Sequence, residues 1–190
     1  SERVALFGRV LAEQLGYDQA ACERLFLTGL LHDVGKIGVS DAVLKKKSRL
    51  TDEEFDEIKR HPDEGWEILQ DLEQLRYVLP GVLYHHEQID GSGYPDGLKG
   101  KEIPLDGRIL AIVDAYDAMT SDRPYRDGMP AKRAQELLRA GAGTQWDADL
   151  VNAFFEALDK IERVRCNYDL RARPVRSGKC EEQGSLPAHA

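Results

Sequence analysis

The stretch VLYHHEQIDGSGYPDG at residues 82–97 places two adjacent histidines, His85 and His86, after an apolar segment and shortly before a glycine-rich loop. Adjacent side chains of a helix point about 100° apart, because only residues three or four apart share a face. The two histidines therefore cannot occupy the same place in a helical core. What they do depends on which other residues the fold brings to them.

Apolar residues on both sides of this stretch recur at the spacing of α-helices. We expect helices over about 4–15, 18–32, 51–70, 72–86, 104–121, 131–140 and 147–161. Thr51 followed by Glu54 is typical of a capping box, and Gly16 is typical of a helix C-cap. These signals place the start of the third helix and the end of the first.

The fourth expected helix contains Pro80 and Gly81, which should kink or interrupt it. Trp66 and Trp146 stand among apolar neighbours at helical spacing, and we expect both in the core. No stretch shows a convincing two-residue alternation of apolar and polar residues. The sequence therefore predicts an all-α bundle of roughly seven helices.

The composition limits the classes of function. The 190 residues carry a net charge of -8, which argues against a nucleic-acid polymer or an anionic membrane surface as the main partner. No apolar run approaches the ~18 residues of a membrane-spanning helix, so we expect no membrane segment. Cys22, Cys166 and Cys180 are widely spaced, which fits a reduced, cytoplasmic protein better than a disulfide framework.

The two ends of the chain differ in character. The first ten residues, SERVALFGRV, lack an initiator methionine and already follow a helical pattern, so we expect a piece cut from a longer protein. RARPVRSGKCEEQGSLPAHA at 171–190 is charged, small and aperiodic, which is typical of disorder. We expect a domain over 1–165, truncated at its N-terminus, and a disordered tail over 166–190. The histidine in the tail, His189, is expected to be solvated.

Six polar residues stand at helix ends, beside a proline or inside apolar segments: His32, Asp33, His61, His85, His86 and Asp114. One such pair alone would favour an ordinary core histidine with a hydrogen-bonded neighbour. A buried carboxylate needs a cation or strong hydrogen-bond donors, and the pattern here repeats. Nitrogen and oxygen ligands without sulfur suit iron, manganese or similar metals better than a cysteine-based zinc site.

The adjacent histidines fit two metal ions better than one. Diverging by about 100°, they can reach two ions a few ångströms apart, and Asp33 stands where its two carboxylate oxygens can bridge such ions. Paired ions ~3.5–4 Å apart polarise a phosphoryl oxygen and lower the pKa of bound water to roughly 7. This chemistry indicates hydrolysis of a phosphate ester or diester.

Five motifs together resemble the HD-GYP family, the branch of the HD phosphohydrolases that hydrolyses the bacterial messenger cyclic di-GMP. They are HDVGK at 32–36, HP at 61–62, HHE at 85–87, DGSGYP at 90–95 and DAYDAMTSDRPYR at 114–126. The resemblance covers about residues 1–160 and keeps the family's motif order. It implies an HD-type helical bundle and a metal-dependent phosphodiesterase that converts cyclic di-GMP to linear pGpG, or on to GMP after a second cut.

The resemblance also implies roles for single residues. It implies metal ligands at His32, Asp33, His61, His85, His86 and Asp114, with two or three divalent ions, iron or manganese, and Asp33 as the bridging carboxylate. Asp33 and Lys36 would be catalytic, with Lys36 neutralising the reacting phosphate. Substrate would be bound by Lys36, by the loop residues Gly93, Tyr94 and Pro95, and by the guanidinium groups of Arg123 and Arg126. Tyr94 would offer a ring face to guanine.

The sequence departs from the family's pattern at the start of the chain. In the family a metal-binding histidine precedes the S-x-R-V seen at residues 1–4, and a glutamate one turn earlier serves members with a third metal. The family further implies a signalling output domain, as in a two-component system, below a receiver or sensory domain, and it allows a homodimer.

Two alternatives to this hydrolase stay open. The first is a catalytically inactive module that binds cyclic di-GMP or a partner protein. The second is an HD hydrolase of ordinary nucleotides, which DGSGYP disfavours.

Overall fold

The computed structural model describes residues 1–122 and 127–172, and within these ranges the chain forms helices and no strand. Ala142 and Trp146 form an isolated bridge. The α-helices are α1 (Glu2–Gln14), α2 (Gln19–Leu31), α3 (Asp41–Leu44), α4 (Asp52–Lys59), α5 (His61–Leu69), α6 (Leu79–Tyr84), α7 (Leu105–Thr120), α8 (Ala131–Ala140), α9 (Ala148–Glu156) and α10 (Leu158–Ala172). The described residues also form the 3-10 helices η1 (Val34–Gly38), η2 (Glu73–Val78) and η3 (Gly100–Glu102). The expectation of an all-α fold is confirmed.

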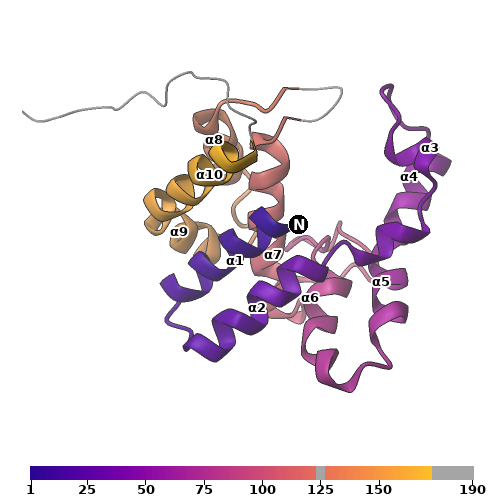
Figure 1. Ribbon diagram of the computed structural model, residues 1–190, viewed down its shortest axis with the longest axis horizontal. Helices are drawn as coiled ribbons and strands as arrows, with labels where there is room; N and C mark the ends of the chain where they lie inside the picture. Colours follow the sequence, from indigo (N-terminus) through magenta and orange to yellow (C-terminus); the bar gives the residue numbers. More distant parts are fainter. Residues whose placement is uncertain (123–126, 173–190) are drawn as a thin grey trace, which may run out of the picture.

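Helix α7 is central to the main core. Its apolar residues Ile109, Leu110, Ile112, Val113 and Tyr116 are all 0% exposed, and they pack with buried side chains of α1, α2, α8, α9 and α10. In Figure 1, α8, α9 and α10 lie to the left of α7, and α5 and α6 lie to its right. Since α7 is surrounded by apolar residues, a polar side chain on it has to be matched by its neighbours.

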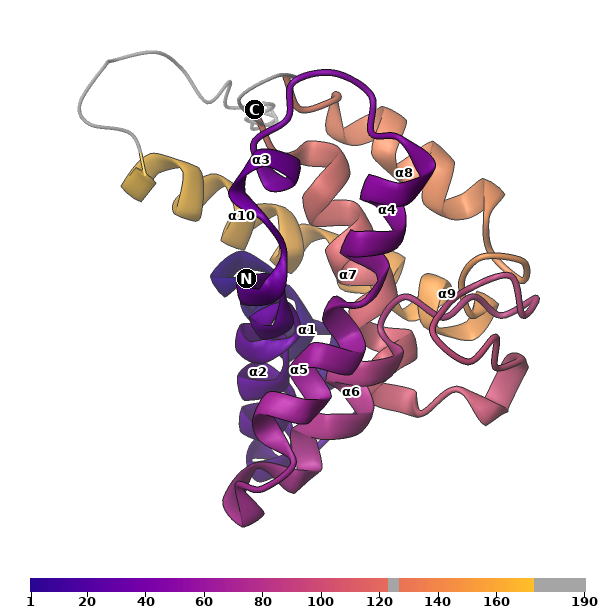
Figure 2. The ribbon, with the colours of Figure 1, turned by 90° about the vertical axis from the view of Figure 1, so that its right-hand side faces the viewer.

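A second, smaller core lies under α5 and α6. It consists of the buried residues Leu69, Val78 and Val82, with Leu27 and Leu31 of α2 packed against it. Leu69 ends α5 and Val82 lies in α6, so these contacts pack both helices against the last turns of α2. In Figure 2, α2, α5 and α6 lie side by side, while α3 and α4 extend away from them.

The expected start and stop signals of two helices are confirmed. Thr51 and Glu54 form the capping box of α4, and Gly16 after α1 has a φ of 81°, which favours glycine. The single helix expected over 51–70 is instead two helices, α4 and α5, separated at Arg60. Pro62 stands in the first turn of α5, where its missing N–H costs no hydrogen bond.

Two other expected helices are also divided. Over 72–86 the chain forms η2 and then α6, and Pro80 lies in the first turn of α6. Over 147–161 it forms α9 and α10, with a break at Ala157. Helix α10 continues to Ala172, so the first part of the expected tail over 166–190 is helical. Residues 173–190, with Cys180 and His189, lie outside the described residues.

The two tryptophans have different environments. Trp146 is 7% exposed and donates its indole N–H to the carbonyl of Ala111 at 3.2 Å, as expected of a core residue. The expectation for Trp66 is wrong, because its side chain is 37% exposed. Helix α5 buries the face that carries His61, Gly65 and Leu69, and Trp66 stands about 100° from it. No helix in the described part of the chain has both the length and the apolar character needed to cross a membrane.

Candidate metal centre

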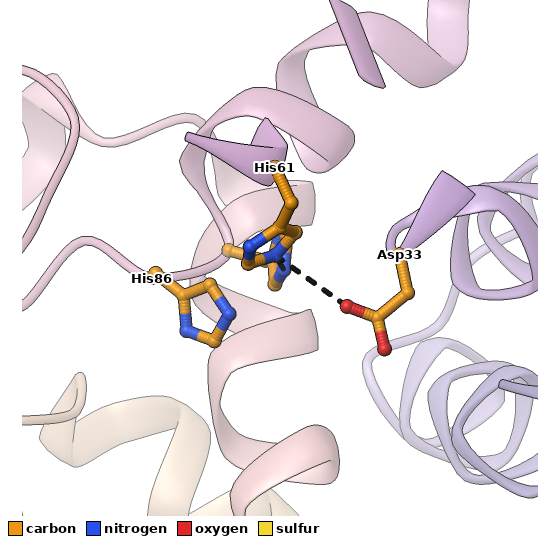
Figure 3. Close-up of side chains that lie close together, drawn as sticks. Asp33, His61 and His86 are labelled. Carbon is orange, nitrogen blue, oxygen red and sulfur yellow. Dashed lines mark hydrogen bonds and ion pairs between the residues drawn. The ribbon is translucent and has the colours of Figure 1, made fainter. Parts of the chain in front are cut away.

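Four of the six predicted ligands meet at one point. Asp33, His61, His85 and His86 each offer one ligand atom, and these four atoms lie within 4.8 Å of one another. Figure 3 shows His61 facing Asp33 across a distance of 3.4 Å between Nε2 and Oδ1, with His86 turned toward the same space. Asp33 follows α2, His61 begins α5, and His85 and His86 follow α6, so the fold assembles the ligands from separate segments.

Three of the histidines are oriented by the same local device. The Nδ1 atoms of His32, His61 and His85 lie 2.7, 2.6 and 2.8 Å from the carbonyl oxygens of the residues three positions earlier, Gly29, Ile58 and Val82 respectively. A carbonyl can only accept, so each Nδ1 carries a proton, and in a neutral ring Nε2 then keeps its lone pair. A metal-ligating histidine is usually held in this way.

The position of Pro62 explains why the carbonyl of Ile58 is available to His61. In a continuous helix this carbonyl would accept from the N–H of residue 62, four positions later. Proline has no N–H, so the helix ends and the carbonyl accepts from the imidazole of His61 instead. The HP motif at 61–62 thus sets both the helix break and the orientation of the ligand.

The distance between two of the imidazoles fits a cation. Nε2 of His61 and Nε2 of His85 are 3.2 Å apart, and with both Nδ1 atoms protonated neither Nε2 of the neutral rings carries a proton. Two lone pairs at this distance repel each other unless a positive centre lies between or beside them. Burial lowers the pKa of His61, and it lowers that of His85 well below its usual range. Both rings are therefore neutral and suited to bind a metal.

Asp33 stands between two groups of ligands. Its Oδ1 faces Nε2 of His61 at 3.4 Å, and its Oδ2 faces Nε2 of His32 at 3.3 Å. Asp114 of α7 lies next to His32, with its Oδ1 3.6 Å from the Nε2 of His32. The structure therefore brings all six predicted ligands into one cluster. One carboxylate oxygen of Asp33 faces His61 and the other faces His32.

The cluster contains two carboxylates that require positive charge nearby. Burial lowers the pKa of His32, but the carboxylates of Asp114 and Asp33 outweigh this effect and raise it to about 10. Burial also raises the pKa of Asp33, yet His32 and Lys36 hold it well below its usual range. In the protein alone, Lys36 at 2.6 Å from Asp33 and protonated His32 supply the charge. Divalent cations would supply it in their place, so the donor set fits metal ions.

Gly35 allows the close approach that joins Asp33 to His61. A Cβ at this position would lie 1.9 Å from the carbonyl oxygen of His61 and 2.5 Å from the amide nitrogen of Gly65. Only glycine lets the backbone of η1 contact the first turns of α5 at this distance. The VGK segment after the HD pair therefore contributes by its packing as well as by Lys36.

The loop after His86 is held by a residue whose role sequence reasoning missed. Glu87 is 3% exposed, and its carboxylate accepts from the backbone N–H groups of Asp96, Gly97 and Leu98 at 2.8, 2.9 and 3.1 Å. A Cβ on Gly93 would lie only 2.3 Å from the amide nitrogen of Gln88. From the sequence alone, a glutamate at this position is expected on the surface. The one signal for a role in binding the loop was that Glu87 directly precedes a loop with many backbone N–H groups.

The structure describes four of the six predicted substrate-binding residues, Lys36, Gly93, Tyr94 and Pro95. The ring of Tyr94, which was expected to face guanine, stacks on the imidazole of His86, with centroids 4.8 Å apart and an angle of 22°. Lys36 is bound to Asp33 at the edge of the cluster, and Pro95 follows Tyr94 in the loop. Arg123 and Arg126 lie outside the described residues. A cavity of about 200 Å³ borders this loop, lined among others by His86, Tyr94 and Asp114.

A family model described as HD domain matches residues 1–150. The chain belongs to the HD domain family. Two curated relatives are a cyclic di-GMP phosphodiesterase response regulator, RpfG, of Xanthomonas campestris pv. campestris (39% identical, covering 86% of this chain and 44% of the relative) and a 3'3'-cGAMP-specific phosphodiesterase of Vibrio cholerae (37% identical, 85% and 35%). The resemblance of this HD domain to HD-GYP proteins is thereby confirmed.

A solved structure of an HDG"Y"P protein from Bdellovibrio bacteriovorus shares the fold of this HD domain. It has a TM-score of 0.69 at 24% identity and covers 83% of this chain and 51% of that one. This HD domain thus spans about a third to a half of the length of the proteins to which it is similar.

Proposed function

We propose that this HD domain is a metal-dependent phosphodiesterase that hydrolyses cyclic di-GMP to pGpG, and on to GMP after a second cut. The observation that carries the proposal is the two-sided environment of Asp33, with His61 on one oxygen and His32 on the other. The names of the curated relatives support a cyclic dinucleotide as the substrate class. The DGSGYP motif points to the same class.

In this proposal His32, Asp33, His61, His85, His86 and Asp114 hold the ions. Two divalent ions, when bound, supply Lewis acidity toward a phosphoryl oxygen and an acidified water for the attack. Lys36 is held at the edge of the cluster by Asp33, from where its ammonium can neutralise charge that develops on the phosphate. We further propose that Gly93, Tyr94 and Pro95 border the bound substrate, and that Arg123 and Arg126 contact its phosphates.

The metal itself is proposed to be iron or manganese. All candidate ligands are imidazole nitrogens and carboxylate oxygens, and this set suits both metals. We propose that these residues would hold two ions, with one oxygen of Asp33 facing His61 and the other facing His32, and that a third ion would need further ligands. Anaerobic metal analysis by mass spectrometry tests the number, and two ions per chain are expected.

The test of function is hydrolysis by the anaerobically loaded protein, followed by chromatography of pGpG and GMP. Asp33→Asn keeps the shape of the side chain but loses the charge, and we expect it to abolish hydrolysis together with one or both ions. Asp159→Asn, on the exposed face of α10, is the matched control and should behave as the unaltered chain. Hydrolysis by Asp33→Asn at the unaltered rate would refute the proposal.

The inactive binding module remains the second candidate. It predicts that the protein binds cyclic di-GMP, measured by equilibrium dialysis, without metal-dependent turnover. Parallel assays with 3'3'-cGAMP and with mononucleotides separate the remaining substrates, since one relative is named as specific for 3'3'-cGAMP. Preferential hydrolysis of mononucleotides would favour the ordinary nucleotide hydrolase.

The cellular setting is also a proposal. We propose a cytoplasmic output domain of a two-component system, below a receiver or sensory domain, because one relative is named a response regulator. The reading frame upstream of Ser1 tests this point directly. A homodimer is proposed as well, and the molar mass in solution from light scattering tests it.

A further inference from the structure

His86 is the exception among the four clustered histidines in how its ring is held. The rings of His32, His61 and His85 each bond through Nδ1 to a backbone carbonyl at the end of a helix. No hydrogen bond joins the ring of His86 to another residue within 1–122 and 127–172. Helix α6 ends at Tyr84 with His85 as its C-cap, so His86 lies beyond the helix and its carbonyls. Something else must fix the plane of this imidazole if it is to bind a metal.

The contacts of the His86 ring are aromatic. His85 lies at 4.1 Å between centroids and His61 at 5.0 Å, the latter edge-on at 83°. Tyr94 covers a face of the ring almost in parallel, at 4.8 Å and 22°. A stacked ring restricts rotation about χ2 because any turn of the imidazole would push it into its neighbour. Among these contacts, Tyr94 is the one that is not itself a candidate ligand.

The loop that carries Tyr94 is held firmly at this position. The backbone N–H of Tyr94 donates to the carbonyl of His86 at 3.2 Å, which ties the two stacked residues together directly. On the far side of the loop, Glu87 accepts the N–H groups of residues 96–98. Gly93 lets the loop lie against the backbone of residues 87–88. The loop is therefore fixed on both sides of Tyr94.

We propose that Tyr94 is a positioning residue whose ring fixes the plane of the His86 imidazole, and that Glu87 holds the loop in the place where this stacking occurs. The proposal rests on the proposed function only in taking His86 as a metal ligand. It adds a role toward His86 to the proposed place of Tyr94 beside the substrate, because one face of the tyrosine ring is covered by His86. The hydroxyl group has no part in stacking, so phenylalanine should replace tyrosine.

The first experiment measures the ring of His86 without metal. In a ¹H–¹³C NMR spectrum of the whole chain in EDTA, each histidine gives a Cε1–Hε1 signal, and His86→Gln identifies the one of His86. We expect Tyr94→Leu to displace and broaden this signal, while Tyr94→Phe leaves it in place. Glu87→Gln should displace it in the same direction by a smaller amount, because it weakens charge-assisted bonds to the loop. An unchanged signal in Tyr94→Leu would overturn the proposal.

The second experiment measures metal affinity by anaerobic Mn²⁺ titration of the same variants. We expect Tyr94→Leu to weaken at least one Mn²⁺ site by about 10–100-fold, the usual effect of losing a group that orients a ligand. Tyr94→Phe should stay within about twofold of the unaltered chain. Tyr77→Leu, at an exposed tyrosine of η2, is the control and should have no effect. Unaltered Mn²⁺ affinity in Tyr94→Leu would overturn the positioning role.

The outcomes separate this proposal from the proposed function. If the unaltered chain binds no Mn²⁺, the proposed function fails, and the NMR comparison in EDTA still decides whether Tyr94 fixes His86. If Tyr94→Phe binds Mn²⁺ normally but no longer hydrolyses cyclic di-GMP, the hydroxyl acts on the substrate and a pure positioning role is refuted. Recovery of both signal and affinity by phenylalanine, and not by leucine, is the result that supports the proposal.

Discussion

Replacing Gly35 by alanine tests the packing on which the cluster depends. The added Cβ would lie 1.9 Å from the carbonyl oxygen of His61 and 2.5 Å from the amide nitrogen of Gly65. Both neighbours are backbone atoms, so no side chain can turn away to make room. Ordinary contact begins near 3.4 Å, so η1 and α5 must move apart by more than an ångström. Gly35 has no positive φ, so the expected effect is steric and not conformational.

The expected cost of Gly35→Ala follows from its two consequences. Overpacking of a close contact destabilises a fold by about 1–3 kcal/mol. In a protein of this size, 2 kcal/mol lowers the melting temperature by roughly 4–8 °C. Because the shift separates Asp33 from His61, which are 3.4 Å apart across this contact, we also expect Mn²⁺ affinity to fall by about 10–100-fold.

Gly8→Ala provides the matched control for this experiment. Gly8 lies inside α1, and a Cβ there would meet its nearest neighbour, Leu110, at 3.9 Å, an ordinary contact. Alanine in a helix interior is favoured over glycine by about 0.5–1 kcal/mol, so Gly8→Ala should stabilise. Urea unfolding in EDTA gives the stability, and Mn²⁺ titration gives the affinity. Gly35→Ala within about 0.5 kcal/mol of the unaltered chain, with unchanged Mn²⁺ affinity, would refute the reasoning.

Three further predictions concern other parts of the molecule. Arg3→Met removes the charge that pairs with Asp117 and Asp169. Since both carboxylates are partly exposed, we expect the free energy of unfolding in urea to fall by about 1–3 kcal/mol. An unchanged free energy of unfolding would refute a stabilising role for Arg3. Thr51→Ala removes the cap of α4 and should cost about 1 kcal/mol in the same assay, with unchanged stability as the contrary result. Mn²⁺ at 100 times its dissociation constant should raise the free energy of unfolding by about 2.7 kcal/mol, which raises the melting temperature by roughly 5–11 °C. EDTA should reverse this rise. A melting temperature that does not depend on metal would contradict the metal centre.

Much of the fold follows from local patterns in the sequence. The apolar spacing indicated the helices, and the capping box at Thr51 and the glycine at 16 marked ends that the structure confirms. The break between α4 and α5 was missed because the apolar spacing continues across it. Pro62 carried a signal for that break, since a proline inside a helical pattern ends the helix at about the preceding residue.

The site was less accessible to sequence reasoning than the fold. The types and positions of six polar residues in apolar segments indicated a cluster, because buried carboxylates and histidines need partners. The stacking of Tyr94 on His86 and the three hydrogen bonds of Glu87 form because the loop folds back onto the residues that precede it. The spacing of residues in the sequence does not predict this folding back. Trp66 is exposed for a similar reason, because the partner surface decides which face of α5 is buried.

The adjacent histidines can now be explained by where helix α6 ends. His32, His61 and His85 all stand where a helix has just ended or a new one begins, and each takes a carbonyl from the last turn of a helix. Such carbonyls lack an intrahelical partner, so helix ends orient imidazoles without further residues. A fourth histidine on the same helix face would need three or four further residues, which α6 does not have. Because His86 comes directly after His85, it lies beyond the helix and reaches the cluster from another direction. Its ring therefore lacks the bond to a helix carbonyl that orients the other three histidines. The loop with Tyr94 follows within eight residues, and in our proposal its stacking holds this second imidazole in place of a carbonyl.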